Sequence, residues 1–353
     1  MSRFFSQKYN HLEAYTPGEQ PKDMQYVKLN TNESPFPPSE KALKYAAQAA
    51  ERLQLYCDPD CTVLTREFCK LYGLEKDEVL FTNGSDDALN FAFMAFCDEE
   101  HPALFADITY GFYPVFAELN RVPYVEVPLR GDFTLSKDDY GQLNGTVFLA
   151  NPNAPTGIAL SSAEIEAMLC SRPDRLHVID EAYVDFGAES VLPLIKRYDN
   201  LLVIQTFSKS RSMAGARLGF AVGCEGLIRD LNTLKYSTNP YNVNRMTSAA
   251  GIAAIAENDY YRENAARIIE NRNWTREQLK NLGFEVTDSR SNFLFARTDC
   301  IPGNELYLRL KERGVLVRHF HKDRIEDFVR ITIGSREQME RLIAEIRTIF
   351  DIA

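Results

Sequence analysis

Between residues 103 and 206 the sequence alternates short apolar runs with amphipathic stretches, and this alternation constrains the fold most. The runs predict strands at 103–106, 122–127, 146–150, 176–179 and 201–206, with helices at 110–119 and 162–170. Strands that alternate with helices usually form a largely parallel sheet with crossover helices. The sequence therefore predicts an α/β fold, in which ligands bind at the carboxyl ends of the strands.

The chain is expected to fold in three parts. Its 353 residues exceed the roughly 250 to 300 that one core usually supports. Residues 1–30 are polar and aromatic with little periodicity, and we expect an arm laid across another surface. Residues 31–257 form the expected large domain, which also holds helices at 41–53, 63–72 and 87–97 and a strand at 78–82. A long polar helix at 259–281 opens the expected small domain, 258–353, with strands at 285–287, 292–296, 315–318 and 328–333 and helices at 303–313 and 336–350.

Composition argues against several kinds of partner. With a formal charge of -10 and a pI near 5.2, the chain lacks the basic surface that nucleic acids or anionic membranes require. No apolar run approaches the length of a membrane span, and the N-terminus has no apolar core of signal-peptide length. Seven cysteines at irregular spacing indicate a reducing compartment, and we expect a cytoplasmic protein.

Two short motifs could suggest a metal site. Cys57 and Cys61 are close in sequence, and His319 and His321 share one face of an expected strand. Neither pair is accompanied by further ligands at a metal-binding spacing. We therefore expect structural side chains here and no metal.

A lysine follows the buried strand expected at 201–206. The strand breaks into a loop of small residues that holds Lys209, with Ser208 beside it and Arg217 further along. Lysine is costly to desolvate and its pKa shifts readily on burial, which suits an amine kept partly neutral for imine chemistry. A hydroxyl and a guanidinium can together bind a dianionic phosphate. This loop predicts a pyridoxal-phosphate pocket, with a solvated polar loop as the alternative.

Other expected strand ends supply complementary groups. Asp180 closes a buried strand and can pair with the pyridine nitrogen of such a cofactor, while Tyr183 can hydrogen-bond the ring hydroxyl. Tyr110 offers an aromatic face for stacking, although such a tyrosine, taken alone, is more often a core or rim aromatic. The segment 83–86 leads into the helix expected at 87–97, and backbone N–H groups at a helix N-terminus can hold an anion.

The order of these motifs resembles a known family. The motifs are Asn-Glu-Ser-Pro at 32–35, Gly-Ser-Asp at 84–86, Thr-Tyr-Gly at 109–111, Asn-Pro-Asn-Ala-Pro-Thr-Gly at 151–157, Asp-Glu-Ala-Tyr at 180–183, Thr-Phe-Ser-Lys at 206–209 and Ala-Gly-Ala-Arg-Leu-Gly-Phe at 214–220. They resemble the fold-type I pyridoxal-phosphate aminotransferases, and within them the histidinol-phosphate aminotransferase family. The resemblance implies a large domain with a mostly parallel seven-stranded sheet flanked by helices, a small α+β C-terminal domain, and pyridoxal 5'-phosphate (PLP) as cofactor.

The resemblance also implies roles for individual residues. Lys209 is implied as the Schiff-base lysine and proton shuttle, Asp180 as the partner of the pyridine nitrogen, Tyr183 as the partner of the ring hydroxyl and Tyr110 as the stacking ring. The implied partners of the cofactor phosphate are Gly84, Ser85, Asp86, Ser208 and Arg217, joined by Tyr56 of the neighbouring subunit, which implies a homodimer. Asp86 is expected to act through its N–H group, because its carboxylate would repel a phosphate.

One position departs from the family pattern. The family has asparagine directly before Pro-Thr-Gly, and this chain has Ala154 there. Either Asn153 partly substitutes for the missing amide, or Tyr183 is the main partner of the ring oxygen.

Four further residues are implied at the substrate. These are Arg330, Arg318, Tyr15 and Asn32, which match family positions that face a substrate phosphate. A pair of arginines suits a dianion better than a carboxylate. The implied reaction transfers an amino group between L-histidinol phosphate and 2-oxoglutarate. The alternatives are an aminotransferase for aromatic or other amino acids, an enzyme like threonine-phosphate decarboxylase, and a non-catalytic PLP-binding sensor.

Overall fold

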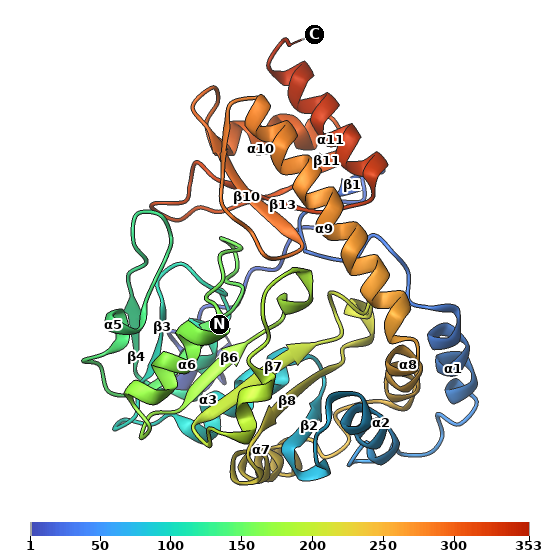
Figure 1. The fold of residues 1–353 in the computed structure, drawn as a ribbon, viewed down its shortest axis with the longest axis vertical. Coiled ribbons are helices and arrows are strands. Elements are labelled where there is room, and N and C mark those ends of the chain that lie inside the picture. The colour runs from blue at the N-terminus through green and yellow to red at the C-terminus, as the bar shows by residue number, and fades with distance from the viewer. Residues whose placement is uncertain (1, 353) are drawn as a thin grey trace.

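A seven-stranded sheet forms the centre of the larger part of the computed structural model, which describes residues 2–352 (Figure 1). The strands, in the spatial order β2-β8-β7-β6-β5-β3-β4, are β2 Val79–Thr82, β3 Ala103–Ala106, β4 Tyr124–Val127, β5 Thr146–Ala150, β6 His177–Asp180, β7 Leu201–Thr206 and β8 Gly219–Gly223. The four pairs that join β4, β3, β5, β6 and β7 are parallel, whereas β8 runs antiparallel to both β2 and β7. The predicted α/β fold with a mostly parallel sheet is confirmed.

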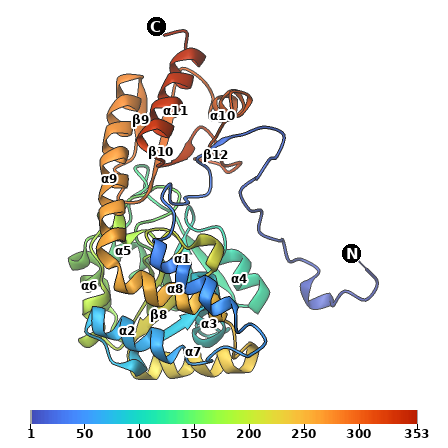
Figure 2. The same ribbon diagram turned by 90° about the vertical axis from the view of Figure 1, so that its right-hand side faces the viewer.

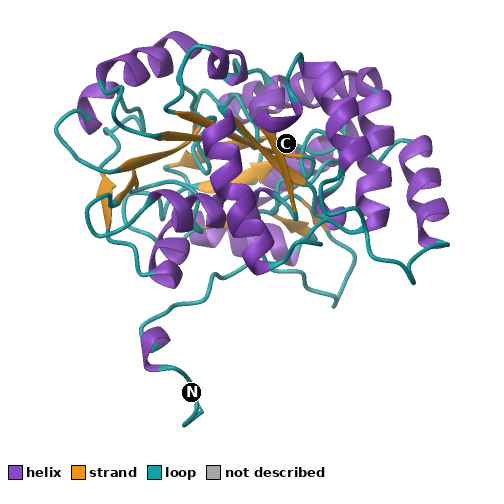
Figure 3. Cartoon of the chain, turned by 90° about the horizontal axis from the view of Figure 1, so that it is seen from below, coloured by secondary structure: helices purple, strands orange, loops and turns teal. Residues whose placement is uncertain are grey.

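Helices cover both faces of this sheet (Figure 3). They are α1 Glu40–Ala50, α2 Thr62–Tyr72, α3 Ser85–Phe96, α4 Tyr113–Asn120, α5 Lys137–Tyr140, α6 Ser162–Ser171, α7 Glu225–Thr238 and α8 Arg245–Ala256. Successive side chains of a strand point to opposite faces. In β5, Val147 and Leu149 pack in a cluster with α2, α6 and α8, while Phe148 packs with α3, α4 and α7. Burial of both faces explains why these strands are continuous apolar runs in the sequence.

A smaller antiparallel sheet carries the C-terminal part of the chain. Its strands, in the order β12-β13-β10-β9, are β9 Phe284–Val286, β10 Phe293–Thr298, β12 Arg318–His319 and β13 Val329–Thr332. The helices that pack on it are α9 Asn258–Asn281, α10 Gly303–Glu312 and α11 Arg336–Ile349. In Figure 1, α9 runs from beside the large sheet to this smaller one. The connection agrees with a bridging role for this helix.

The N-terminal segment is only partly a free arm. Figure 2 shows its first residues extending away from the rest of the chain. Before residue 30, however, β1 Val27–Lys28 pairs in parallel with β11 Val315–Leu316, and the N–H of Thr332 donates to the carbonyl of Leu29 at 2.9 Å. The last residues of the expected arm thus belong with the C-terminal part, while the domain boundaries themselves stay a prediction.

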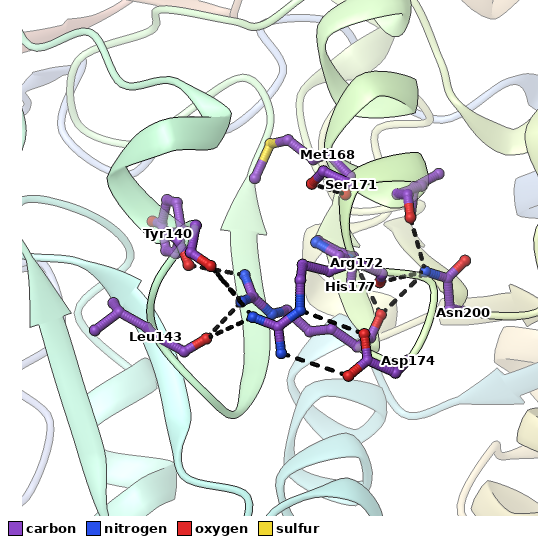
Figure 4. A network of polar contacts seen from close by, with 11 residues as sticks. Tyr140, Leu143, Met168, Ser171, Arg172, Asp174, His177 and Asn200 are labelled. Atoms are coloured by element: carbon purple, nitrogen blue, oxygen red, sulfur yellow. Dashed lines mark hydrogen bonds and ion pairs between the residues drawn. The ribbon is translucent and has the colours of Figure 1, made fainter.

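A polar network closes the amino ends of β6 and β7 (Figure 4). Asn200, just before β7, donates from its side-chain nitrogen to the carbonyls of Leu169, Arg172 and Arg175 at 3.3, 3.2 and 3.1 Å. His177, the first residue of β6, contacts the Arg175 carbonyl at 3.1 Å, and burial lowers the pKa of its imidazole to about 4. The network satisfies carbonyls that would otherwise be buried without partners. The cavity described below lies at the opposite, carboxyl ends of the same strands.

Some elements were not predicted. The sequence analysis missed β8, α7 and α8. Glycine disfavours strands, and β8 begins and ends with it. A Cβ at Gly219 would lie 2.3 Å from the Ser85 backbone nitrogen, so the close approach of β8 to α3 requires glycine. The strand expected at 315–318 is split, because β11 pairs with β1 while β12 pairs with β13.

Within residues 2–352 we find no helix with the length and apolar character that a membrane crossing requires.

Candidate active site

The carboxyl ends of the central strands open into a cavity of about 490 Å³. Its walls come from the loops after β3, β5, β6 and β7, from the start of α3, from the segment before α1, and from the C-terminal part around β12 and β13. The predicted site residues that line it are Tyr15, Asn32, Ser85, Asp86, Tyr110, Asp180, Tyr183, Ser208, Lys209, Arg217, Arg318 and Arg330. Residues from distant parts of the sequence therefore meet at the sheet edge where the sequence analysis expected a ligand.

Lys209 projects into this cavity from the loop after β7. The loop is fixed by backbone bonds: Phe207 donates to the Leu218 carbonyl at 2.9 Å, and Met213 donates to the Phe207 carbonyl at 3.0 Å. The Lys209 Nζ donates to the Thr31 carbonyl at 3.3 Å and lies 5.7 Å from the centre of the Tyr183 ring. Within residues 2–352 it forms no ion pair. Its amine is therefore held by one long hydrogen bond and can engage a ligand.

Asp180 is buried at the end of β6. One carboxylate oxygen accepts the Ala182 N–H at 3.1 Å, and the other accepts the Tyr113 hydroxyl at 3.1 Å. Burial raises the pKa of this carboxyl to about 6, against the lowering effect of the two hydrogen bonds. A buried carboxylate without a cationic partner is costly, and a protonated ring nitrogen could supply that partner.

Tyr113 was not singled out by the sequence analysis. It begins α4 and is fully buried, and its only sequence signal was its place one helical turn after Tyr110. The hydroxyl of a tyrosine this deeply buried needs a partner, and Asp180 supplies it. The tyrosine therefore orients the carboxylate from within the core.

The start of α3 forms an anion cradle with the loop that precedes β8. Gly84 has a φ of +84°, and a Cβ there would lie 2.4 Å from an Arg217 guanidinium nitrogen. Ser85 and Asp86 form the first turn of α3, where N–H groups lack partners within the helix. On the opposite side, the Thr206 hydroxyl donates to the Ser208 hydroxyl at 2.9 Å. Backbone N–H groups, a serine and an arginine thus surround one space.

The carboxylate of Asp86, to which the sequence assigned no role, binds two neighbouring side chains. One oxygen accepts from Arg217 at 2.8 Å, and the other accepts the Tyr110 hydroxyl at 2.8 Å. The carboxylate thus points at the two side chains that flank the cradle. It holds the guanidinium and the aromatic ring in fixed positions relative to each other.

Asn32 links Tyr183 to the C-terminal part of the chain. Its side-chain nitrogen donates to the Tyr183 hydroxyl at 3.0 Å, and its backbone N–H donates to the Thr332 hydroxyl at 2.9 Å. The side-chain nitrogen of Asn292 donates to the Asn32 carbonyl at 3.0 Å. These bonds hold Asn32 at a φ of 56°, in the left-handed region that asparagine tolerates.

Two arginines lie directly opposite each other at the far end of the cavity. Arg318 of β12 and Arg330 of β13 are partners in the antiparallel register. Arg330 donates to the Asn30 carbonyl at 3.0 Å, and its Nε is buried without a hydrogen bond. Arg318 donates to the carbonyls of Thr16 and Pro17 at 3.4 and 3.3 Å. Neither guanidinium is paired with a carboxylate of residues 2–352. Like charges placed directly across a sheet repel, so this end of the cavity favours an anion.

Tyr15 closes the same end from the N-terminal segment. Its ring stacks on Phe112 with the ring centres 4.1 Å apart. Burial raises the pKa of its hydroxyl, although the nearby Arg318 and Arg330 oppose the shift. Lys322 also lines the cavity and donates to the Asp107 carbonyl at 2.5 Å. The sequence analysis missed Lys322, which no motif marked.

Three predicted residues do not line the cavity. Gly84 precedes the cradle's first helical turn and is not among the lining residues. The amide of Asn153 is taken up by its neighbours, since its nitrogen donates to the Ile108 carbonyl at 2.9 Å and its oxygen accepts the Thr109 hydroxyl at 2.7 Å; Ala154 faces the cavity instead. Tyr56 is 80% exposed and stacks on Tyr241, away from the cavity of its own chain. A role for Asn153 at the ring hydroxyl thus finds no support in this geometry.

Comparison with known proteins identifies the class. The family model for aminotransferase class I and II matches residues 24–346, and the chain belongs to this family. Enzymes of this family depend on PLP.

Particular relatives are closer. The chain is 46% identical over 351 residues to the histidinol-phosphate aminotransferase of Brachyspira hyodysenteriae, with 99% of each chain covered. It is 49% identical over 347 residues to histidinol-phosphate aminotransferase 1 of Bradyrhizobium diazoefficiens, covering 98% of this chain and 99% of the relative. The crystal structure of histidinol-phosphate aminotransferase from Sinorhizobium meliloti in complex with pyridoxal-5'-phosphate superposes with a TM-score of 0.84 at 24% identity, covering 92% of each chain. That likeness shows the same fold.

The residues around the cavity match the chemical groups of PLP. The cofactor needs an amine, an acid for its ring nitrogen and a cradle for its phosphate. Lys209, Asp180 and the start of α3 offer these groups around one space. A Cβ at Gly84 would collide with the Arg217 guanidinium of the cradle, and within residues 2–352 the buried Asp180 forms no ion pair.

Proposed function

We propose that the chain is a PLP-dependent aminotransferase that transfers the amino group of L-histidinol phosphate to 2-oxoglutarate. The observation that carries this choice of donor is the facing pair Arg318 and Arg330, which has no carboxylate partner within the described chain. Two adjacent guanidinium groups match the charge and the oxygens of a phosphate dianion. The names of the curated relatives support the same donor.

The residues around the cofactor have separate tasks in this proposal. When bound, PLP supplies an electron sink for the bond that breaks at the amino-bearing carbon. Asp180, oriented by Tyr113, holds the proton on the ring nitrogen. Lys209 would anchor the cofactor, and its Nζ, once freed by the donor, would take the proton from the amino-bearing carbon and deliver it to the cofactor's C4′.

Other side chains hold the cofactor in place. Tyr183, oriented by Asn32, donates to the ring hydroxyl, and Tyr110 stacks on the ring. Ser85, Ser208 and Arg217 bind the cofactor phosphate, with the guanidinium steadied by Asp86. Fixing the ring at its nitrogen, hydroxyl and phosphate presents the donor to Lys209 in one orientation.

The substrate phosphate is held at the opposite end of the cavity. Arg330, Arg318 and Tyr15 bind its oxygens, and Tyr15 can donate its hydroxyl proton, since a tyrosine is protonated at neutral pH and burial raises its pKa further. Asn32 contributes through Tyr183 rather than by direct contact, as its amide nitrogen already donates to that hydroxyl.

We also propose that two copies form a homodimer in the cytoplasm. Tyr56 is 80% exposed and is steadied by stacking on Tyr241 with ring centres 4.6 Å apart. Leu53 and Leu55 beside it are exposed as well. An apolar patch of this kind suits contact with a second copy, whose cavity Tyr56 enters to reach the cofactor phosphate.

The test is the formation of glutamate from 2-oxoglutarate with the PLP-loaded protein. Donors are L-histidinol phosphate, L-histidinol, L-phenylalanine and O-phospho-L-threonine, the last also assayed for carbon dioxide release. We expect L-histidinol phosphate to have the highest kcat/KM, by at least about tenfold over L-histidinol, because a dianion gains charge-assisted hydrogen bonds at the arginine pair. Preference for the unphosphorylated donors, or carbon dioxide release, would contradict the proposal.

A further inference from the structure

A second buried carboxylate lies directly after Asp180. Glu181 is 1% exposed and does not line the cavity. Its carboxylate accepts three hydrogen bonds: from the Val191 N–H at 2.6 Å, from the Ser190 hydroxyl at 2.6 Å and from the Gln205 side-chain nitrogen at 2.7 Å. A buried carboxylate is costly, and these bonds offset the cost. The reaction described above does not use this group.

The three donors come from two segments that lead to the catalytic groups. Gln205 belongs to β7, which runs into the Lys209 loop. Ser190 and Val191 end the loop that starts with Ala182 and carries Tyr183. A backbone hydrogen bond also joins Glu181 to β7, since the Glu181 N–H donates to the Ile204 carbonyl at 2.8 Å. Glu181 thus ties its own loop and the end of β7 to the end of β6.

A further contact fixes the two loops to each other. The Ser210 hydroxyl donates to Asp185, which lies in the loop between Tyr183 and Ser190. Ser210 directly follows Lys209 and is buried. The loop held by Glu181 therefore contacts the lysine loop from the side away from the cavity.

We propose that Glu181 is a positioning residue, which through Ser190, Val191 and Gln205 fixes Asp180 and Tyr183 relative to Lys209. The proposal rests on the roles assigned above to those three residues. Asp180 faces the cavity and Glu181 faces away from it, so one strand end carries both a catalytic group and the group that holds it in place. Displacements of about 1 Å in a catalytic site can lower turnover about 100-fold.

The experiment compares the PLP-loaded wild type with Glu181→Ala, Glu181→Gln, Gln205→Ala and the double variant Glu181→Ala/Gln205→Ala. Glutamine at 181 can accept the Val191 N–H with its oxygen and donate with its nitrogen to the Ser190 hydroxyl. The same nitrogen can donate to the side-chain oxygen of Gln205 if the Gln205 amide flips. Alanine can form none of these bonds. The matched control is Asn200→Ala, which also removes three buried hydrogen bonds, at the amino end of the same strands (Figure 4).

Two readouts separate positioning from stability. The first is the pH midpoint of the visible absorbance of lysine-bound PLP without substrate. The second is the rate at which saturating L-glutamate removes that absorbance. The apparent KM of L-glutamate and the melting temperature of each variant are measured separately, beside these two readouts. The first readout needs no donor, so it stands even if L-histidinol phosphate is not the substrate.

We expect Glu181→Ala to shift the midpoint and to lower the half-reaction rate about tenfold or more with little change in KM. Glu181→Gln should stay near the wild type, and the double variant should lose less than the two single losses combined. Asn200→Ala should lower the melting temperature and leave both readouts unchanged. If Glu181→Ala behaves like Asn200→Ala, the proposal is wrong. If Glu181→Ala does not fold, Gln205→Ala decides the matter, since a wild-type midpoint and rate in that variant would equally overturn it.

Discussion

At the scale of single residues, charged side chains that form no ion pair within residues 2–352 indicate where a ligand binds. Arg318 and Arg330 face each other across two strands, and among residues 2–352 both donate only to backbone carbonyls. Asp180 is buried with hydrogen-bond donors, and no cation of residues 2–352 forms an ion pair with it. Each arrangement is unfavourable in the free protein and becomes favourable when a ligand of opposite charge binds.

The arginine pair gives the first prediction. Arg318→Met should lower the ratio of kcat/KM for L-histidinol phosphate to that for L-histidinol by about 10- to 100-fold. The reason is that a charge-assisted hydrogen bond is worth about 1.5 to 3 kcal/mol. The same variant should melt at an equal or higher temperature than the wild type, because it removes repulsion across the strands. A lower melting temperature with unchanged donor preference would show that Arg318 is a structural residue.

The buried acids give a pH prediction for the cofactor-free protein. Burial raises the pKa of Asp180 to about 6 and that of Glu181 to about 7. The folded protein then holds protons that the unfolded chain has lost, so stability falls as pH rises from about 4 through these values. One pKa unit corresponds to about 1.4 kcal/mol. The effect of Glu181 should therefore amount to roughly 3 kcal/mol between pH 4.5 and 8.

Urea unfolding of the cofactor-free wild type and Glu181→Gln at several pH values tests this. Relative to the wild type, Glu181→Gln should gain stability as pH rises from 5 to 8, because glutamine has no proton to lose. Parallel stability curves for the two proteins would contradict the raised pKa.

At the scale of elements, the close approach of β8 to the start of α3 builds the phosphate cradle. Gly219→Ala should weaken PLP binding and cost about 1 to 3 kcal/mol of stability, because its Cβ would meet the Ser85 nitrogen at 2.3 Å. Gly215→Ala is the control, since nothing lies within 4 Å of a Cβ there. PLP titration and thermal melting check both variants. Equal PLP affinities would mean that the cradle tolerates a methyl group.

Periodicity predicted the elements whose burial is regular. The strands at 103–106, 146–150 and 201–206 have the bounds that were expected, because burial on both faces produces continuous apolar runs. β8 was missed because its glycines serve a contact with a distant segment, which no local pattern records. The site loops could be predicted because each follows an apolar strand, and parallel sheets bind ligands at the carboxyl ends of their strands.

Contacts between distant segments could not be predicted in this way. Tyr113, Lys322 and Glu181 gain their importance from partners that lie far away in the sequence. Asn153 shows that a suggestive motif can mislead: its amide binds the carbonyl of Ile108 and the hydroxyls of Thr109 and Thr156, and it does not line the cavity.

At the scale of the whole molecule, the cavity depends on segments from both sheets and from the N-terminal part. If Tyr56 serves the neighbouring subunit, inactive variants can complement each other. Mixing Lys209→Ala with Tyr56→Ala under conditions that exchange subunits should form hybrids with one intact cavity, which restores about one quarter of the wild-type activity in an equal mixture. If sedimentation of labelled subunits verifies the exchange and no activity is recovered, Tyr56 does not act in the cavity of the neighbouring subunit.

An absorbance titration of the purified protein with L-histidinol phosphate decides whether Lys209 binds PLP and whether this donor reacts. We expect a visible band from lysine-bound PLP, its loss on adding L-histidinol phosphate, its return on adding 2-oxoglutarate, and its absence in Lys209→Ala. A band that responds to other amino acids and not to L-histidinol phosphate would contradict the proposed donor. No band in the PLP-treated wild type would contradict the assignment of Lys209 and of the cavity around it.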